Sequence, residues 1–457
     1  MEISSQSDWR AGLRTVIFAL LAVAVILSMV ASRQVPFAER IEPRKAELLV
    51  RGGNTFTDAS YLLLDAGWSS EEIEPLLHRA REFYQASLEA DPSSPRALLS
   101  LALVLHMLGH KAEAIPLALK VQEGIHTESQ RRQLGAVASL LISEKPSPSA
   151  LENAHDHLMG RGPGMLFIAL RYDESGDHEQ ALRILEEAAG QAQRVRKALF
   201  TAVIVNGAIV LCGIVFLTWR LLFGRRSSPE TKPLGPPSWS LKEATEALIL
   251  WVFLSVVLTS AAKAILTEGS EGPVRVLLLP SFLAAGLAIV WVWVAAGCRS
   301  GFGWIRSQLL RNFVVGVSTT GLAVLPILWM YSLFQEVLGQ SPADDPVLPL
   351  LIMPDTIWAK ALLILLIGGV APALEETLFR GILYRGLRVR WSFLPAAAMS
   401  ATLFAIAHVH LAGFTAYAIL GFLFAYLFER TNSLVTPWAA HAAFNTFNLI
   451  VLFVLFG

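Results

Sequence analysis

Long apolar runs recur along this chain, and they constrain its fold more than any other feature. A helix needs about 20 apolar residues to cross a bilayer, and most of these runs approach that length. Charged residues make up only 16% of the sequence, against about 25% in typical soluble domains. The sequence therefore predicts an all-α, polytopic membrane protein, a helical bundle of about nine spans. The expected spans are residues 16–31, 198–223, 244–265, 276–297, 313–334, 357–374, 393–407, 411–428 and 434–456.

The first apolar run follows Arg10 and Arg14, a basic flank that is typical of a membrane anchor. We interpret residues 1–35 as this N-terminal anchor. A cleaved signal peptide is the alternative, because Val30-Ala31-Ser32 resembles a small-residue cleavage site. Either interpretation sends the following segment across the membrane.

Residues 36–195 mix polar and apolar positions at helical spacing and contain no run of membrane length. The sequence Gly-His-Lys-Ala-Glu-Ala-Ile begins at Gly109, and a similar sequence, Gly-Asp-His-Glu-Gln-Ala-Leu, begins at Gly176. The two glycines lie 67 residues apart, nearly twice the tetratricopeptide period of about 34 residues. We predict a tetratricopeptide-like helical repeat domain of about three helix pairs, whose concave face binds a protein partner or a substrate. An irregular helical bundle is the alternative.

Local signals in this region predict where individual helices begin and end. Ser69-Ser70-Glu71-Glu72 is a capping pattern, and Asp91-Pro92 ends the helix that it starts. Glycine or proline breaks bound the other helices. The expected helices are 70–90, 95–108, 130–143, 150–158 and 165–175.

Lysine and arginine residues in short loops predict the orientation of a membrane protein. They follow the expected second, fourth and sixth spans, for example at Arg225, Arg299 and Arg385, whereas the intervening loops are acidic. This alternation places the N-terminus in the cytoplasm, and it places the repeat domain and the C-terminus outside. The lipid bilayer is thus one partner. The formal net charge is zero, so a nucleic acid is not expected as another.

Paired acids interrupt an apolar helix in the last part of the chain. We divide that part into residues 196–345, membrane helices with a linker, and residues 346–457, the expected catalytic core. Glu375 and Glu376 stand in the core, where buried charge is costly unless it is paired or functional. Glu376 and Arg380 are four residues apart on one helix face, so we predict that Arg380 holds Glu376 while Glu375 faces elsewhere.

Three further polar residues, His408, His441 and Asn445, stand in the apolar segments that follow. His441 and Asn445 share a helix face. If the helix of Glu375 continues to about residue 387, its carboxylate lies roughly 20 Å from the cytoplasmic end, and His408 lies at a similar depth. The His441 and Asn445 side chains lie about 10 to 18 Å into the last span. We predict that all four side chains meet at one level. A membrane histidine that merely bonds a neighbouring helix is the alternative.

Such a set of groups suits hydrolysis by water. A carboxylate and an imidazole acting on one water molecule form a general base. Histidine and asparagine side chains can donate to a developing oxyanion. No serine or cysteine stands near a histidine in an obvious nucleophile motif, so water is the expected nucleophile. A zinc site with Glu375, His408 and His441 as ligands is the alternative, although the His-Glu-x-x-His spacing is absent.

Three motifs in the last span segments resemble those of the CAAX-protease and bacteriocin-processing (CPBP) family of intramembrane proteases. This family includes prenyl-protein endopeptidases and the bacterial Abi proteins. The resemblance covers about residues 357–456, under a quarter of the chain. The motifs are Glu375-Glu376-x-x-x-Arg380, Phe404-x-x-x-His408 and His441-x-x-x-Asn445.

The resemblance implies a role for each motif. Glu375 and His408 would activate water, His441 with Asn445 would form the oxyanion pocket, and the Glu376–Arg380 pair would support the site. Family members are described both as metalloproteases and as metal-free glutamate enzymes. The cofactor therefore stays open between a divalent metal such as zinc and none.

Together these inferences predict an intramembrane endopeptidase of a bacterial plasma membrane, which acts on a membrane-associated protein or peptide and carries its repeats outside the cytoplasm. A non-catalytic scaffold or immunity-type protein, acting through its repeats, is the alternative. A transporter is disfavoured, because the sequence shows no obvious inverted repeat of broken helices.

Overall fold

The fold, given by a computed structural model, is built from helices. Among the residues described there is no strand, which confirms the expected all-α class. The predicted anchor lies outside the described residues, and the predicted span 198–223 lies mostly outside them. The structure describes residues 37–65, 69–124, 134–143, 146–157, 163–193, 235–265, 272–297, 301–305, 308–338, 356–408, 410 and 413–456, with isolated positions between 197 and 215.

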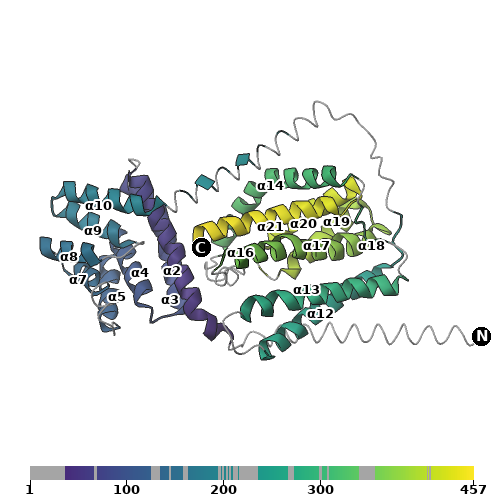
Figure 1. Ribbon diagram of the computed structural model, residues 1–457, viewed down its shortest axis with the longest axis horizontal. Coiled ribbons are helices and arrows are strands. Elements are labelled where there is room, and N and C mark those ends of the chain that lie inside the picture. Colours follow the sequence, from purple (N-terminus) through teal and green to yellow (C-terminus); the bar gives the residue numbers. More distant parts are fainter. Residues whose placement is uncertain are drawn as a thin grey trace, which may run out of the picture. The chain divides into compact units, whose positions relative to one another are not determined.

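The chain forms two compact units. One consists mainly of Ala38–Ile204, and the other mainly of Val205–Gly339 and Met353–Ile450. Figure 1 shows the helices of the first unit in purple to blue and those of the second in teal to yellow. The predicted boundaries 36–195, 196–345 and 346–457 remain predictions.

Turns of three or four residues join α3 to α4, α4 to α5 and α9 to α10 in the first unit. The capping box at Ser69 is present as predicted: the Glu72 backbone N–H donates to the Ser69 hydroxyl, and the Ser69 N–H donates to the Glu72 carboxylate at 2.7 Å. Gly109 and Gly176 both turn the chain with positive φ, at +84° and +88°. The helices are α2 (Phe37–Asp65), α3 (Ser70–Ala90), α4 (Pro95–Met107), α5 (Lys111–Glu123), α7 (Ala136–Ile142), α8 (Pro148–His157), α9 (Pro163–Glu174) and α10 (His178–Gln191).

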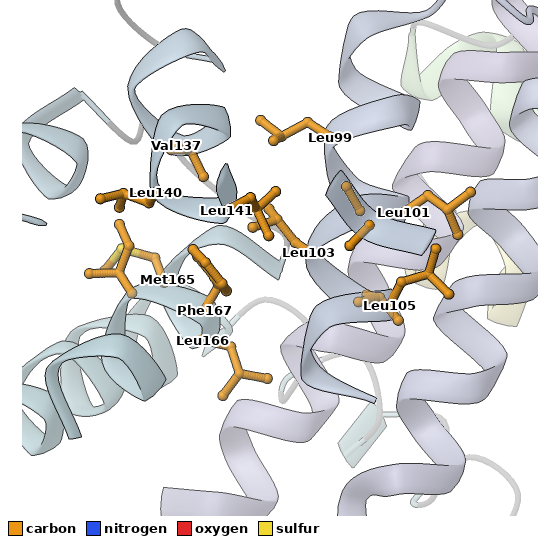
Figure 2. Packing of buried hydrophobic residues seen from close by; sticks show 14 of the residues in the cluster. Leu99, Leu101, Leu103, Leu105, Val137, Leu140, Leu141, Met165, Leu166 and Phe167 are labelled. Carbon is orange, nitrogen blue, oxygen red and sulfur yellow. The ribbon is translucent and has the colours of Figure 1, made fainter. Parts of the chain in front are cut away.

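The core of this unit forms where α4, α7 and α9 meet, as Figure 2 shows. Leu103, Leu140 and Phe167 are almost completely buried there. Each such side chain contributes about 1.5 to 3 kcal/mol through burial of its apolar surface.

The packing of α9 differs from that of an extended repeat array. In such an array each repeat contacts only its neighbours. Here α4 contacts α7 and also α9: the His106 ring meets the Phe167 ring edge-on at 5.1 Å. The Leu166 N–H also donates to the Tyr61 hydroxyl of α2, at 3.1 Å. These contacts favour the helical-bundle alternative, and the tetratricopeptide assignment stays a prediction.

The second unit contains the membrane helices. Predicted span 393–407 coincides with α19, and six other predicted spans match helices to within a few residues at their starts. The elements are α12 (Leu241–Ile265), α13 (Gly272–Ala295), α14 (Leu309–Val337), α16 (Ile357–Leu363), η3 (Ile364–Val370), α17 (Ala371–Glu376), η4 (Thr377–Tyr384), α18 (Arg385–Arg388), α19 (Phe393–Ala407), α20 (Phe414–Thr431) and α21 (Val435–Phe456), where η3 and η4 are π-helical.

Two helices in the described part of the chain are long and apolar enough to cross a membrane, Leu241–Ala262 and Ile357–Arg388. A bent pair, Leu309–Val324 with Pro326–Phe334, adds a third if it is counted as one span. The remaining spans of the predicted nine stay predictions. The run from α16 to α18 is continuous through the paired acids, as expected.

Glycines let the helices around the site approach closely. A Cβ at Gly316 of α14 would lie 2.3 Å from the Thr436 carbonyl oxygen of α21, so no larger residue fits there. One turn further, the Thr320 hydroxyl donates to the Ala440 carbonyl at 2.7 Å. A Cβ at Gly421 of α20 would lie 2.9 Å from the Ala401 Cα of α19. These contacts fix the helices that carry the candidate residues.

Candidate active site

The paired acids lie on α17, a six-residue α-helix between the π-helical segments η3 and η4. In a π-helix the carbonyl of residue i pairs with the N–H of residue i+5. The Ala371 N–H donates to Leu366 in this way, but the partner expected for Ile367 would be Pro372, which has no N–H. The sequence therefore leaves the Ile367 carbonyl without a helical partner.

Helix α21 satisfies the carbonyls of η3. The Asn445 side-chain Nδ2 donates to the Ile367 carbonyl at 3.0 Å. The Trp438 Nε1 donates to the Gly369 carbonyl, also at 3.0 Å. Residues 438, 441 and 445 lie on one helix face. The face of α21 that carries His441 therefore also donates hydrogen bonds to the backbone carbonyls of η3.

Glu376 is the buried member of the acid pair. Its Oε1 accepts hydrogen bonds from Arg380 Nη1 and from His441 Nδ1, both at 3.0 Å, and its side chain is 0% exposed. The other Arg380 nitrogen, Nη2, donates to the Gly421 carbonyl at 2.8 Å, and the guanidinium lies 4.6 Å from the centre of the Phe404 ring. The prediction that Arg380 holds Glu376 is confirmed.

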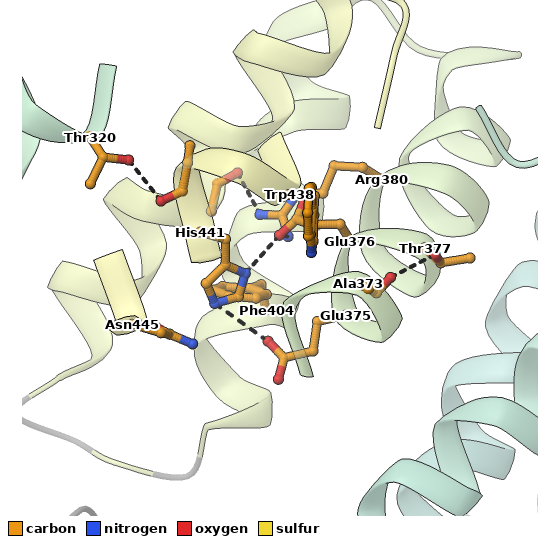
Figure 3. A network of polar contacts seen from close by, with 12 residues as sticks. Thr320, Ala373, Glu375, Glu376, Thr377, Arg380, Phe404, Trp438, His441 and Asn445 are labelled. Carbon is orange, nitrogen blue, oxygen red and sulfur yellow. Dashed lines mark hydrogen bonds and ion pairs between the residues drawn. The ribbon is translucent and has the colours of Figure 1, made fainter. Parts of the chain in front are cut away.

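Glu375 is the accessible member of the pair. Its side chain is 24% exposed, and its Oε2 lies 3.8 Å from Nε2 of His441, as Figure 3 shows. The Glu376 carboxylate that pairs with Arg380 only accepts hydrogen bonds, so Nδ1 of His441 carries a hydrogen. The opposite nitrogen, Nε2, faces Glu375.

His408 lies at the end of α19, and three contacts hold its ring. Its Nδ1 lies 2.8 Å from the Phe404 carbonyl oxygen, which only accepts, so Nδ1 carries a hydrogen and Nε2 has a lone pair when the ring is neutral. One ring face stacks on Tyr417 at 4.3 Å, and the ring also contacts Phe404 at 4.6 Å. The Phe404 ring contacts His441 at 5.7 Å, so both imidazoles pack against one phenyl ring.

The structure thus brings Glu375, Glu376, Arg380 and His441 into one network of direct polar contacts. His408 lies beside this group, because the Phe404 ring contacts both His408 and His441. Asn445 lies one helix turn from His441, where its amide bonds the backbone of η3.

Sequence reasoning missed the side chains that hold these groups. Phe404 belongs to the Phe-x-x-x-His motif, yet its contacts with both histidines depend on the packing of three helices. Trp438 precedes His441 by three residues, and this helical spacing is a signal that could have placed it on the same face. Tyr417 offers no comparable signal in the sequence.

A metal ion was the alternative interpretation of these residues. Among the residues that the structure describes, no group of three or more His, Cys, Asp or Glu side chains is placed to hold one. Zinc sites generally use three or four such ligands at about 2 Å. Glu375, His408 and His441 do not fit a metal ion as they are arranged.

Comparison with known proteins gives a family model and a relative that match this chain. Residues 357–447 match the family model of the type II CAAX prenyl endopeptidase Rce1-like proteins, and this segment contains all six predicted site residues. The chain is also 37% identical over 97 residues to a Bacillus subtilis (strain 168) protein named "Putative membrane peptidase YdiL". The aligned segment covers 21% of this chain and 40% of that relative, so the chain spans about two fifths of the relative's length. No solved structure matches the chain.

Proposed function

We propose that the protein is an integral-membrane endopeptidase, because residues 357–447 match the family model of the type II CAAX prenyl endopeptidase Rce1-like proteins. It hydrolyses a peptide bond of a membrane-associated protein or peptide with a water molecule as nucleophile. The observation that carries this proposal is the partly exposed Glu375 carboxylate, which lies 3.8 Å from Nε2 of His441 beside the buried Glu376–Arg380 pair.

Glu375 and His408 activate the water molecule in this proposal. Of the two adjacent acids, only Glu375 is open to a water molecule, because Glu376 is 0% exposed and engaged by two donors. The neutral His408 ring offers the lone pair of Nε2 to the water, since Nδ1–H is engaged by the Phe404 carbonyl. Glu375 takes a proton from water as its oxygen attacks the peptide carbonyl carbon, and then passes that proton to the leaving amine.

His441 and Asn445 stabilise the oxyanion formed by that attack. One N–H of the Asn445 amide is engaged by Ile367, which leaves the second to donate. His441 donates from Nε2 only when both ring nitrogens carry hydrogen, because its Nδ1–H is held by Glu376. Donors of this kind typically contribute about 100- to 1000-fold in rate.

We place the first unit outside the cytoplasm, on the outer side of a bacterial plasma membrane, where it binds a protein partner or delivers a substrate. The basic loops that follow the expected second, fourth and sixth spans support this orientation. A pull-down with the full chain should recover a partner that a chain lacking residues 36–195 does not.

The test of the proposed activity is cleavage of a library of membrane-associated peptides by the purified full-length protein. Glu375→Gln removes the base while it keeps the shape of the side chain, so kcat should fall at least about 100-fold. Glu186→Gln, a change in a similar but exposed acid pair of α10, is the matched control and should cleave normally. Cleavage that survives Glu375→Gln would refute the mechanism, and an inactive wild-type protein would favour the scaffold alternative.

A further inference from the structure

Trp304 lies outside the segment that matches the family, in the stretch 301–305 between α13 and α14, yet it contacts the acid-bearing helix. Its Nε1 donates to the Thr377 hydroxyl at 3.0 Å. Thr377 directly follows Glu376 in the sequence. A residue supplied by an earlier part of the chain therefore reaches the end of α17.

The stretch that carries Trp304 is itself fixed to the residues before α21. The Leu434 N–H donates to the Gly303 carbonyl at 2.8 Å, and the Ser433 hydroxyl donates to the Ile305 carbonyl at 3.3 Å. Gly303 has a φ of +110°, which a side chain would disfavour. These two hydrogen bonds therefore fix the backbone on both sides of Trp304.

Thr377 links Trp304 to α17 through a second hydrogen bond. Its hydroxyl also bonds the Ala373 carbonyl, at 2.7 Å. An indole N–H can only donate, so the hydroxyl must accept from Trp304 and give its own hydrogen to Ala373. The direction of both bonds is therefore fixed, and the chain of bonds ends two residues before Glu375.

A second indole holds the other end of α17. Trp438 donates to the Gly369 carbonyl, just before α17 begins, and its ring meets the Trp304 ring at 6.1 Å and 66°. The two indoles thus contact each other and bond the chain on both sides of a six-residue helix. Because π-helical turns flank this helix, its position depends on contacts from outside more than that of a regular helix would.

We infer that Trp304 and Trp438 form an aromatic clamp that positions α17, so that Glu375 stays opposite His441. Both are positioning residues, and the effect on cleavage rests on the proposed function. The α13–α14 connection is then a part of the active site that the matched segment 357–447 does not contain.

The test compares variants of the full-length purified protein by hydrogen exchange of the peptide that covers residues 371–384, and by cleavage. Trp304→Phe keeps the ring and removes the N–H, and Thr377→Val removes the hydroxyl. Each should speed exchange and lower kcat with KM unchanged. Trp304→Phe should lower kcat about three- to tenfold, which is the effect of one lost hydrogen bond, and Thr377→Val, which also loses the bond to Ala373, should lower it at least as much. Thr377→Ser keeps the hydroxyl and both of its hydrogen bonds, so its exchange rate and kcat should equal those of the wild-type protein. Trp358→Phe, a change at an indole that is 81% exposed on α16, is the control and should leave both values unchanged.

The double variant decides whether the two residues act as one unit. Because Thr377→Val already removes the hydrogen bond from Trp304, Trp304→Phe combined with Thr377→Val should be no worse than Thr377→Val alone. Fully additive effects, or wild-type exchange in Trp304→Phe, would overturn the clamp even in an active protease. Faster exchange in both single variants of a protein that cleaves nothing would keep the clamp and overturn the proposed function.

Discussion

The side-chain amide of Asn445 donates a hydrogen bond to the backbone carbonyl of Ile367, across 3.0 Å and between two different helices. Pro372 has removed the N–H that would otherwise pair with this carbonyl in the π-helical register. Asn445 therefore has a structural function besides the proposed catalytic one, and a substitution there should alter both stability and activity.

Replacement of Asn445 by aspartate should be more harmful than replacement by alanine. Alanine leaves the Ile367 carbonyl unpaired, at a cost of about 1 to 3 kcal/mol in the free energy of unfolding. Aspartate places a carboxylate, which only accepts, against that carbonyl and adds repulsion between two oxygens. Thermal unfolding in detergent should rank the variants as wild type, alanine, aspartate from most to least stable. An aspartate variant as stable as wild type would contradict the assigned contact.

The buried Glu376–Arg380 pair should be far more sensitive to loss of one partner than an exposed pair. Arg380→Met leaves a fully buried carboxylate and should destabilise the protein by about 3 to 5 kcal/mol. Adding Glu376→Gln removes that charge and should recover part of the loss. Arg79 and Glu82 form a similarly short but exposed pair, at 2.9 Å, and Arg79→Met should cost at most about 1 kcal/mol. Equal losses from the two arginine changes, measured by chemical unfolding, would contradict this assignment.

The Glu376–Arg380 contact could be predicted because it is local. An i, i+4 spacing fixes which side chains meet on one helix, whatever the helix packs against. The same holds for the Ser69 capping box, which set the start of α3 correctly. The apolar run 393–407 likewise predicted the bounds of α19, because the length of the run and its flanking residues are enough to show where this helix begins and ends.

Contacts between helices could not be predicted in the same way. The π-helical segments beside α17 have sequences that an α-helix would also accept. The sequence alone therefore does not show that the Ile367 carbonyl lacks a partner within its helix and accepts a hydrogen bond from Asn445 instead. The distance from Glu375 to His441 likewise depends on how α21 lies against α17. Helix lengths counted along the chain predict similar depths for these residues, but depth alone does not decide which imidazole faces which acid.

A buried histidine in the first unit should make its stability depend on pH. His106 is 6% exposed, and burial, with Lys111 and Arg171 nearby, lowers its pKa from 6.5 to about 4. The unfolded chain then binds a proton that the folded chain does not between these two values, so the free energy of unfolding falls as the pH drops from 6.5 to about 4. The total effect is at most about 3 kcal/mol.

Hydrogen exchange of α4 in the full chain should detect this loss as faster exchange at pH 5 than at pH 7, after correction for the intrinsic rate. His106→Phe should abolish the difference, because it removes the titrating group from the contact with Phe167. His78→Gln changes an exposed histidine of α3 and should leave it unchanged. A pH effect that persists in His106→Phe would assign it to other groups.

Adjacent glycines in η3 should respond differently to the same substitution. A Cβ at Gly368 would lie 2.3 Å from the Thr446 hydroxyl oxygen, whereas a Cβ at Gly369 would meet only the Leu365 Cδ1, at 3.9 Å. Gly368→Ala should therefore push α21 away from η3, lower stability by about 1 to 3 kcal/mol through overpacking, and reduce cleavage with it. Gly369→Ala should be close to neutral.

A second change can show that the contact with Thr446 is the cause. The Thr446 Cβ would lie 3.5 Å from the added methyl group, which is an ordinary contact, so Thr446→Ala should leave room for it. The double variant Gly368→Ala with Thr446→Ala should recover most of the unfolding temperature lost in Gly368→Ala alone. If it does not, the loss comes from the backbone of η3 itself, and the close approach of α21 is not what requires glycine at residue 368.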